Sequence, residues 1–213
     1  MGRIAGLATG LVALNVVAML ALSYTPVADL ALALFPNFFL GVIAFAASVE
    51  GGYWLASRGV ERGSIGLAGV GVAVTQPGYG AFGAAVLSLA APAVCVPALG
   101  VTAVITGLIT ALVTVAVSRT DRSFAGWQRY AGGLFVGGIV VGAAGVFLAP
   151  ALLVVAGLLF FLGFLVDLVY EVRAVREGRY GTLRSAIGVY VAVMGVFVHV
   201  LQWVLRAMQA TRA

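Results

Sequence analysis

The sequence contains no lysine, one cysteine and one histidine, and only 9% of its 213 residues are charged. A water-soluble chain of this length needs a charged surface, so the shortage of charge excludes an ordinary soluble domain. The absence of lysine excludes a retinal protein, because that chromophore is held as a Schiff base on a lysine amine. Cys95 has no second cysteine with which to form an intramolecular disulfide, and its apolar surroundings are typical of a small buried side chain.

Apolar residues make up 63% of the chain, and they fall into seven long segments. About 20 residues are enough for a helix to cross the hydrocarbon layer of a membrane. The alternating pattern of a membrane barrel is absent, and backbone groups in lipid must find their hydrogen bonds within the protein. We therefore predict an all-α polytopic membrane protein, with residues 1–213 forming a single domain of seven transmembrane helices. The predicted spans are 4–24, 32–57, 64–90, 92–117, 126–148, 150–172 and 184–207.

The arginines, which leave the chain with a formal net charge of +5, gather before the first span and in alternate loops. The loops that carry them follow the second, fourth and sixth spans. Loops rich in positive charge stay in the cytoplasm, so the pattern predicts a cytoplasmic N-terminus and a C-terminus outside the cell. The arginines of these segments are Arg3, Arg58, Arg62, Arg119, Arg122, Arg173, Arg176, Arg179 and Arg184. Arg206 and Arg212 lie near the C-terminus, and their positive charge argues against its predicted position outside the cell.

The distribution of the arginines also distinguishes a membrane from nucleic acid as the partner of this basic chain. Membrane topology accounts for the positive charge, so we expect the lipid bilayer of the cell (plasma or inner) membrane as the partner, and no nucleic acid. The sequence identifies no protein partner and is compatible with a monomer or a weak oligomer.

Two features predict local helix geometry. Pro77 lies inside the third span and is followed by three nearby glycines, which predicts a kink or a break there. The fifth span carries glycines at a spacing of four, which lets helices approach closely in lipid. These glycine pairs are Gly133 with Gly137 and Gly138 with Gly142.

Three acidic residues lie inside predicted spans, where acids are costly and usually face a partner or a cavity. Asp167 and Glu171 share one face of the sixth span, and Glu50 lies about two turns before the end of the second. The topology puts all three on the cytoplasmic side of the midplane. Arg58 and Arg62 end the second span on that side, so we predict them as charge partners of the acids. Burial and a nearby arginine shift a carboxyl pKa in opposite directions, so such a cluster can form an ion or pH site.

Two of the polar residues have competing interpretations. Glu171 lies close enough to the end of its span to be an interfacial side chain that reaches water. His199, the only histidine, is either a neutral packing residue or part of a proton relay. The sequence shows no metal motif, no nucleophile with a nearby base and no phosphate loop, so we predict neither enzyme activity nor a cofactor.

Three stretches of the sequence, together with Glu50 and the arginines after it, resemble the Bax-inhibitor family, the seven-helix transmembrane Bax inhibitor motif proteins of bacterial or archaeal type. "TAVITGLITALVTVAVSRTDRS" (102–123) resembles the fourth helix of that family and its basic loop, "GLLFFLGFLVDLVYEVRAVREG" (157–178) the sixth, and "AIGVYVAVMGVFVHVLQWVLR" (186–206) the seventh. The resemblance covers about residues 40–206 and implies that the seventh helix is central, wrapped by the other six.

The resemblance also implies a pH-modulated leak of cations, chiefly Ca²⁺, controlled by a pair of aspartates. One of the pair corresponds to Asp167, which makes Asp167 the expected contact for a metal ion in transit. The second belongs just after the tyrosine of "VYVAV", where this sequence has Ala192. Glu171 and Glu50 remain as substitutes for it. The alternatives are a non-conducting scaffold or interaction protein whose acid–arginine contacts are structural, and a subunit or small transporter that works with a partner.

Overall fold

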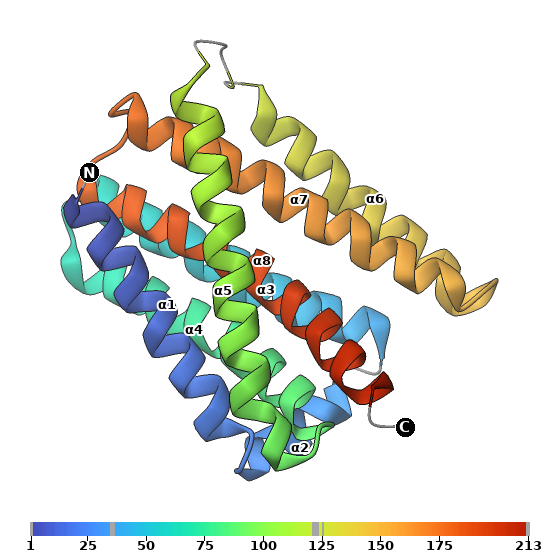
Figure 1. The fold of residues 1–213 in the computed structure, drawn as a ribbon. Helices are drawn as coiled ribbons and strands as arrows, with labels where there is room; N and C mark the ends of the chain where they lie inside the picture. Colours follow the sequence, from blue (N-terminus) through green and yellow to red (C-terminus); the bar gives the residue numbers. More distant parts are fainter. Residues whose placement is uncertain (1, 35–36, 121–123, 125, 212–213) are drawn as a thin grey trace.

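The computed structural model describes residues 2–34, 37–120, 124 and 126–211 (Figure 1). Within these ranges the chain forms eight α-helices and no strand. Seven of the helices in the described ranges, all except α2, are long and apolar enough to cross a membrane. The predicted all-α membrane protein with seven spans is therefore confirmed. The helices are α1 Gly2–Leu22, α2 Pro26–Leu34, α3 Phe38–Glu61, α4 Ile65–Ser88, α5 Pro92–Ser118, α6 Trp127–Phe147, α7 Ala151–Arg176 and α8 Thr182–Ala210.

The predicted second span, 32–57, is wrong at its beginning. Residues up to Leu34 belong to the short helix α2, and the spanning helix α3 begins only at Phe38. The side chain of Asn37 accepts a hydrogen bond from the Leu40 backbone N–H at 3.1 Å and so caps α3. The sequence carries a signal for this boundary, because Pro36 and Asn37 interrupt the apolar run and Asn is a favoured N-cap residue.

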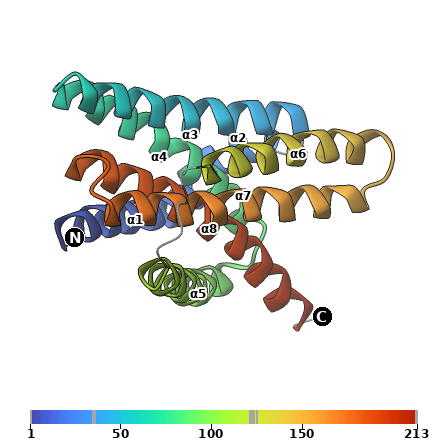
Figure 2. The same cartoon turned by 90° about the horizontal axis from the view of Figure 1, so that it is seen from above.

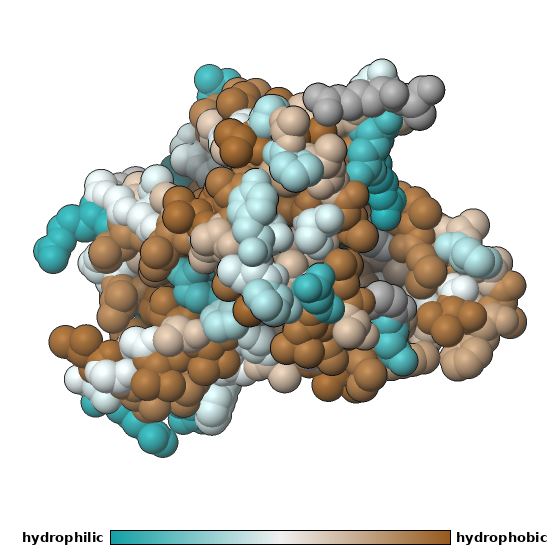
Figure 3. Space-filling view, turned by 90° about the horizontal axis from the view of Figure 1, so that it is seen from below, coloured by the Kyte–Doolittle hydropathy of each residue, from teal (hydrophilic) through white to brown (hydrophobic). Residues whose placement is uncertain are grey.

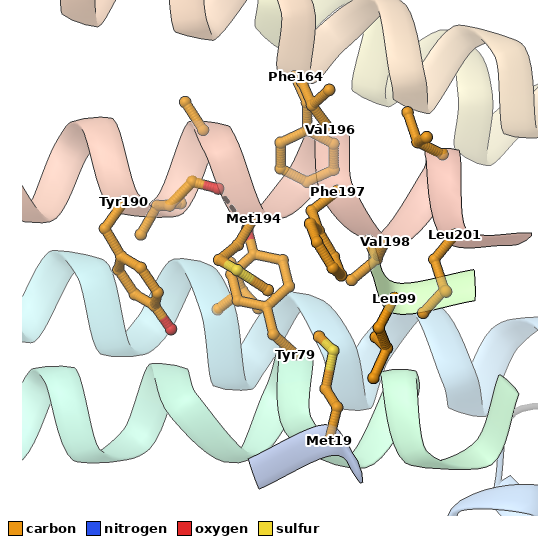
Figure 4. Close-up of a cluster of buried hydrophobic side chains, with 14 of the residues drawn as sticks. Met19, Tyr79, Leu99, Phe164, Tyr190, Met194, Val196, Phe197, Val198 and Leu201 are labelled. Carbon is orange, nitrogen blue, oxygen red and sulfur yellow. Dashed lines mark hydrogen bonds between the residues drawn. The ribbon is translucent and has the colours of Figure 1, made fainter. Parts of the chain in front are cut away.

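The helix α8 lies at the centre of the molecule, as predicted for the seventh span. It packs against α1, α3, α4, α5 and α7. In its most apolar stretch 67% of residues are buried, compared with 17% to 22% for five of the other six spanning helices. Figure 4 shows core side chains from several helices gathered along α8, among them Met19, Tyr79, Leu99 and Phe164. A helix that is apolar on all sides is suited to this position.

The other long helices form two antiparallel hairpins and a crossing helix around α8, and α1 packs against α4 and α8. α3 packs along α4, and α6 packs along α7 (Figure 2). The two hairpins touch each other only lightly, through α3 and α6. α5 is seen nearly end-on in Figure 2 and contacts α8, α7 and α1. The α6–α7 hairpin is therefore held mainly by α8 and α5 rather than by the other hairpin.

Of the kink or break predicted at Pro77, the break does not occur, because α4 is continuous from Ile65 to Ser88. The kink stays a prediction. Pro77 leaves the carbonyl of Ala73 without its helix donor. Two neighbouring helices bind α4 in the same turn: the Ser48 hydroxyl of α3 donates to the carbonyl of Val74 at 2.5 Å, and the Asn15 amide of α1 donates to the carbonyl of Gln76 at 3.1 Å.

In the α3–α4 hairpin the backbones of two helices approach each other closely, a contact that was not predicted from the sequence. A Cβ atom at Gly71 would overlap the backbone of Ala56, and one at Gly52 would overlap Thr75. The glycines predicted for close packing in α6 contribute unequally. Gly138 faces the ring of Phe160 and Gly142 faces that of Phe38, whereas nothing lies near Gly133 and Gly137 has only an ordinary contact with Leu159.

The outer surface suits lipid. Large apolar side chains such as Ile65, Leu112 and Phe147 are exposed, and apolar residues dominate the face seen in Figure 3, with hydrophilic residues in scattered patches. In Figure 1 the start of α1, the turn between α3 and α4, and the ends of α5 and α7 lie at one end of the molecule. The predicted cytoplasmic arginines thus share one side, except that Arg122, and Arg212 at the other terminus, lie outside the described residues.

The α3–α4 contact yields a first prediction. Gly71→Ala should destabilise the protein by about 1–3 kcal/mol, because the added methyl group forces the two backbones apart. Gly69→Ala is the matched control, since nothing lies within 4 Å of a Cβ atom at that position. Thermal unfolding in detergent, followed by circular dichroism, measures both. Equal melting temperatures for the two variants would refute the close contact.

Candidate functional site

Glu171 is buried between three helices, with 1% of its surface exposed. The Tyr53 hydroxyl of α3 donates a hydrogen bond to its Oε1 atom at 2.7 Å, and the Arg184 guanidinium of α8 donates to the same atom at 3.4 Å. Gly188 provides the space for the carboxylate, because a Cβ atom there would overlap it. These four residues are called the Glu171 cluster. The interpretation of Glu171 as an interfacial side chain that reaches water is wrong.

Arg184 is positioned by aromatic rings as well as by the carboxylate. Its guanidinium carbon lies 4.5 Å from the ring centroid of Tyr53 and 4.7 Å from that of Tyr180. The Tyr180 hydroxyl is in turn 2.9 Å from the hydroxyl of Tyr170 on α7. Ring faces attract guanidinium groups, and a planar cation between two rings loses little freedom on binding a carboxylate. The ion pair thus links α7 to the first turn of α8 in a fixed geometry.

The arginines predicted as partners of the acids, Arg58 and Arg62, are not the ones that the structure brings to them. Arg58 is exposed, and its guanidinium lies 5.4 Å from the ring centroid of Trp54. Arg62 is the exposed C-cap residue of α3. Both lie at the end of the helix, where an arginine remains hydrated. Arg184 lies in the first turn of α8, the spanning helix that follows α7, and its side chain therefore reaches Glu171.

Asp167 and Glu50 line a second site, one helical turn deeper than the Glu171 cluster. It is a cavity of about 200 Å³, here called the inner cavity. Neither carboxylate makes a hydrogen bond or an ion pair with any residue that the structure describes. Among the described residues, neither acid therefore has the arginine partner that the sequence predicts. The residues that line the inner cavity are Glu50, Tyr53, Gln128, Ala131, Gly132, Phe135, Asp167 and Val191.

The inner cavity offers few ligands for a resident metal ion. Among the described residues, no group of three or more His, Cys, Asp or Glu side chains is placed to hold one. Ca²⁺ usually takes about six to eight oxygen ligands. The carboxylates of Asp167 and Glu50 with the amide of Gln128 supply fewer, so water would have to complete the shell of any cation there.

His199 lies apart from these acids. Its Nδ1 atom is 2.7 Å from the carbonyl oxygen of Gly195, and a carbonyl only accepts, so Nδ1 carries a proton. The imidazole also packs near the rings of Phe161 and Phe164, at 6.4 Å and 5.7 Å between centroids. These contacts are those of a polar packing residue, and none of them connects His199 to Asp167. The proton relay stays a prediction.

A polar cluster that the sequence analysis missed joins α1, α4 and α8. Asn15 is fully buried, and its side-chain amide donates to Oε1 of Gln76 at 2.5 Å and to the hydroxyl of Tyr190 at 3.0 Å. The Tyr79 hydroxyl donates to the backbone carbonyl of Val191 at 2.8 Å. An amide within an otherwise apolar run is the signal that could have identified Asn15 and Gln76, since polar side chains in lipid seek partners on other helices.

The arginines after Asp167 connect α7 to the end of α5. Arg173 and Arg176 each donate to the backbone carbonyl of Thr120, at 2.8 Å and 3.1 Å, and so stabilise a helix C-terminus with positive charge. Hydrogen bonds from Arg173 and Arg179 hold the pKa of Glu177, which lies beyond the end of α7, below its usual value. Stability from these pairs is therefore complete above the ordinary pKa of a glutamate and is lost as the pH falls through the lowered one.

The Glu171 cluster yields a second prediction. Arg184→Met should destabilise the protein by about 3–5 kcal/mol, because it leaves a buried carboxylate without its counter-ion. Arg58→Met, which removes an exposed arginine that no acid contacts, should change the melting temperature little. Adding Glu171→Gln to Arg184→Met should recover much of the loss, since the unpaired charge is then gone. Equal effects of Arg184→Met and Arg58→Met would contradict this assignment.

Comparisons of this chain with protein-family models, with curated proteins and with solved structures found no match. Its function is therefore inferred from its own residues, and above all from the inner cavity and the Glu171 cluster.

Proposed function

We propose that the protein is a proton-modulated cation leak of the Bax-inhibitor type, in which Asp167 and Glu50 contact the ion in transit. One observation carries the proposal. Two carboxylates from different membrane-spanning helices line the same cavity, and neither forms an ion pair or a hydrogen bond with a described residue. An intramembrane acid without a partner is costly, and a cation drawn into the cavity would offset that cost.

The position of the second acid supports this version of the proposal. Ala192 stands where the Bax-inhibitor resemblance expects an aspartate, and it is fully buried in the core and does not line the inner cavity. Glu50 faces the inner cavity from α3 instead. The pair of acids is then shared between α3 and α7 rather than between the last two spans, and Ca²⁺ is a transported ion rather than a cofactor.

The surroundings of Asp167 support modulation by protons. The groups that face it are Glu50 and Tyr53 from α3, Glu171 on its own helix and Arg184 from α8. Protonation of either carboxylate in the inner cavity removes negative charge and weakens attraction for a cation. The Glu171 cluster contributes by holding α3, α7 and α8 together at the cytoplasmic end of the cavity.

A second candidate is a non-conducting scaffold or interaction protein. It is favoured by the contacts of Glu171, because a carboxylate held by two hydrogen bonds and a close-fitting glycine stabilises a helix bundle without any need for transport. The two candidates differ in what happens at the inner cavity. Only the leak requires Asp167 to be ionised.

The leak yields a third prediction, for Ca²⁺ flux into proteoliposomes. Flux should fall as the solution is made acidic, because the acids of the inner cavity become neutral. Asp167→Asn keeps the shape of the side chain but cannot ionise, so its flux should be low and nearly independent of pH. Asp29→Asn, which changes an exposed acid on α2, is the control and should behave as the original chain.

Melting temperatures of both variants show whether each is folded. If folded Asp167→Asn carries the same flux as the original chain at every pH, Asp167 does not contact the ion and the proposed ion site is refuted. The absence of any flux through the original chain would refute the leak itself and favour the scaffold.

The proposed orientation, with the arginine-bearing side in the cytoplasm, yields a fourth prediction. In intact cells, a membrane-impermeant thiol reagent should label Asp29→Cys but should label Glu61→Cys only after permeabilisation. The native Cys95 is buried, with 2% of its surface exposed, and should not react. If only Glu61→Cys is labelled in intact cells, the orientation is the reverse of the one proposed.

A further inference from the structure

A larger cavity adjoins the inner cavity and opens between the two hairpins. It has a volume of about 420 Å³ and is here called the side cavity. Glu50 and Phe135 line both cavities, so the two meet at these residues. The hairpins touch only lightly where α3 faces α6, which leaves the side cavity accessible from the region that lipid occupies.

The walls of the side cavity are apolar and unusually aromatic. Six phenylalanines line it, and two pairs of these rings meet edge to face: Phe45 with Phe82 at 5.5 Å between centroids, and Phe135 with Phe164 at 4.8 Å. The volume lies within the range of about 300–1,000 Å³ that is usual for ligand pockets. The phenylalanines are Phe38, Phe45, Phe82, Phe135, Phe160 and Phe164.

The polar groups of the side cavity favour a positive ligand. Glu50 supplies a carboxylate that no described residue pairs with. His199 carries its proton on Nδ1, which is bonded to Gly195, so the Nε2 atom of the neutral ring can only accept a hydrogen bond. Gln202 adds an amide, and the described residues that line the side cavity include no arginine.

We infer that the side cavity binds a lipophilic monocation, with the positive centre at Glu50 and the apolar groups among the phenylalanines. Charge complementarity selects a cation over a neutral lipid tail, because a tail would leave the Glu50 carboxylate unpaired in an apolar site. Aromatic rings add attraction for a cation that has shed its water. The volume leaves room for a body with several apolar arms.

This binding site shares Glu50 with the proposed ion leak but does not depend on conduction, and it is tested without an ion gradient. The probe is tetraphenylphosphonium, and its binding to the protein in lipid nanodiscs is measured by equilibrium dialysis, with empty nanodiscs subtracted. We expect saturable binding, and much weaker binding of tetraphenylborate, which has nearly the same shape and the opposite charge. Glu50→Gln should weaken tetraphenylphosphonium binding by about tenfold or more. Glu61→Gln, which alters an exposed acid at the end of α3, should leave it unchanged.

A second variant tests the cavity rather than the charge. Gly157 lines the side cavity, and nothing lies within 4 Å of a Cβ atom there, so Gly157→Leu fills the space without displacing the protein. It should abolish saturable binding while the melting temperature stays near that of the original chain. The inference is overturned if no saturable binding occurs, if tetraphenylborate binds as tightly as tetraphenylphosphonium, or if either Glu50→Gln or Gly157→Leu binds like the original chain.

Discussion

A carboxylate cannot remain charged among membrane helices unless other helices come to it, and the arrangement of α3, α7 and α8 follows from this constraint at Glu171. The acid takes a hydrogen bond from Tyr53 on α3 and an ion pair from Arg184 on α8. It also needs Gly188, since any larger residue would occupy the same space. Three helices are thereby fixed at one end, and the inner cavity lies directly beyond the point where they meet. Arg184 forms its ion pair with Glu171, so among the described residues Asp167 and Glu50 have no direct ion pair. A role in transport is therefore proposed for these two acids rather than for the more deeply buried Glu171.

The two hairpins around the Glu171 cluster pack in different ways. The α3–α4 hairpin is tight because glycines let the two backbones touch, while the α6–α7 hairpin packs through phenylalanine rings set against glycines. Few contacts join one hairpin to the other. The side cavity occupies the space between them, and Glu50 is placed where this apolar space meets the polar one. A single side chain thus faces two environments that would attract different ions.

The sequence was sufficient for the features that depend on composition, and insufficient for those that depend on which helices are neighbours. Seven spans and the arginine-bearing side follow from apolar length and loop charge, and they agree with the structure. The central position of α8, which only the family resemblance implied, agrees as well. Arg184 was counted as a loop arginine, because nothing in its own segment shows that Tyr53 and Glu171 surround it. Arg58 was chosen as a partner because it follows Glu50 in the chain, although the end of α3 leaves it hydrated beside Trp54. The α2 boundary was missed although Pro36 and Asn37 mark it in the sequence, because the prediction joined the apolar segments on both sides into one span.

The position of α8 has a consequence for biogenesis. This helix forms the centre of the bundle, yet it is the last of the eight to leave the ribosome. Until it inserts, Glu171 lacks Arg184 and the buried amide of Asn15 lacks Tyr190, so the earlier helices hold polar groups in lipid with incomplete partners. The first seven helices can therefore enter the membrane before α8, but their core is complete only when α8 arrives. A cell that surveys nascent membrane proteins for unpaired polar groups would recognise any chain interrupted before Thr182 as unfinished.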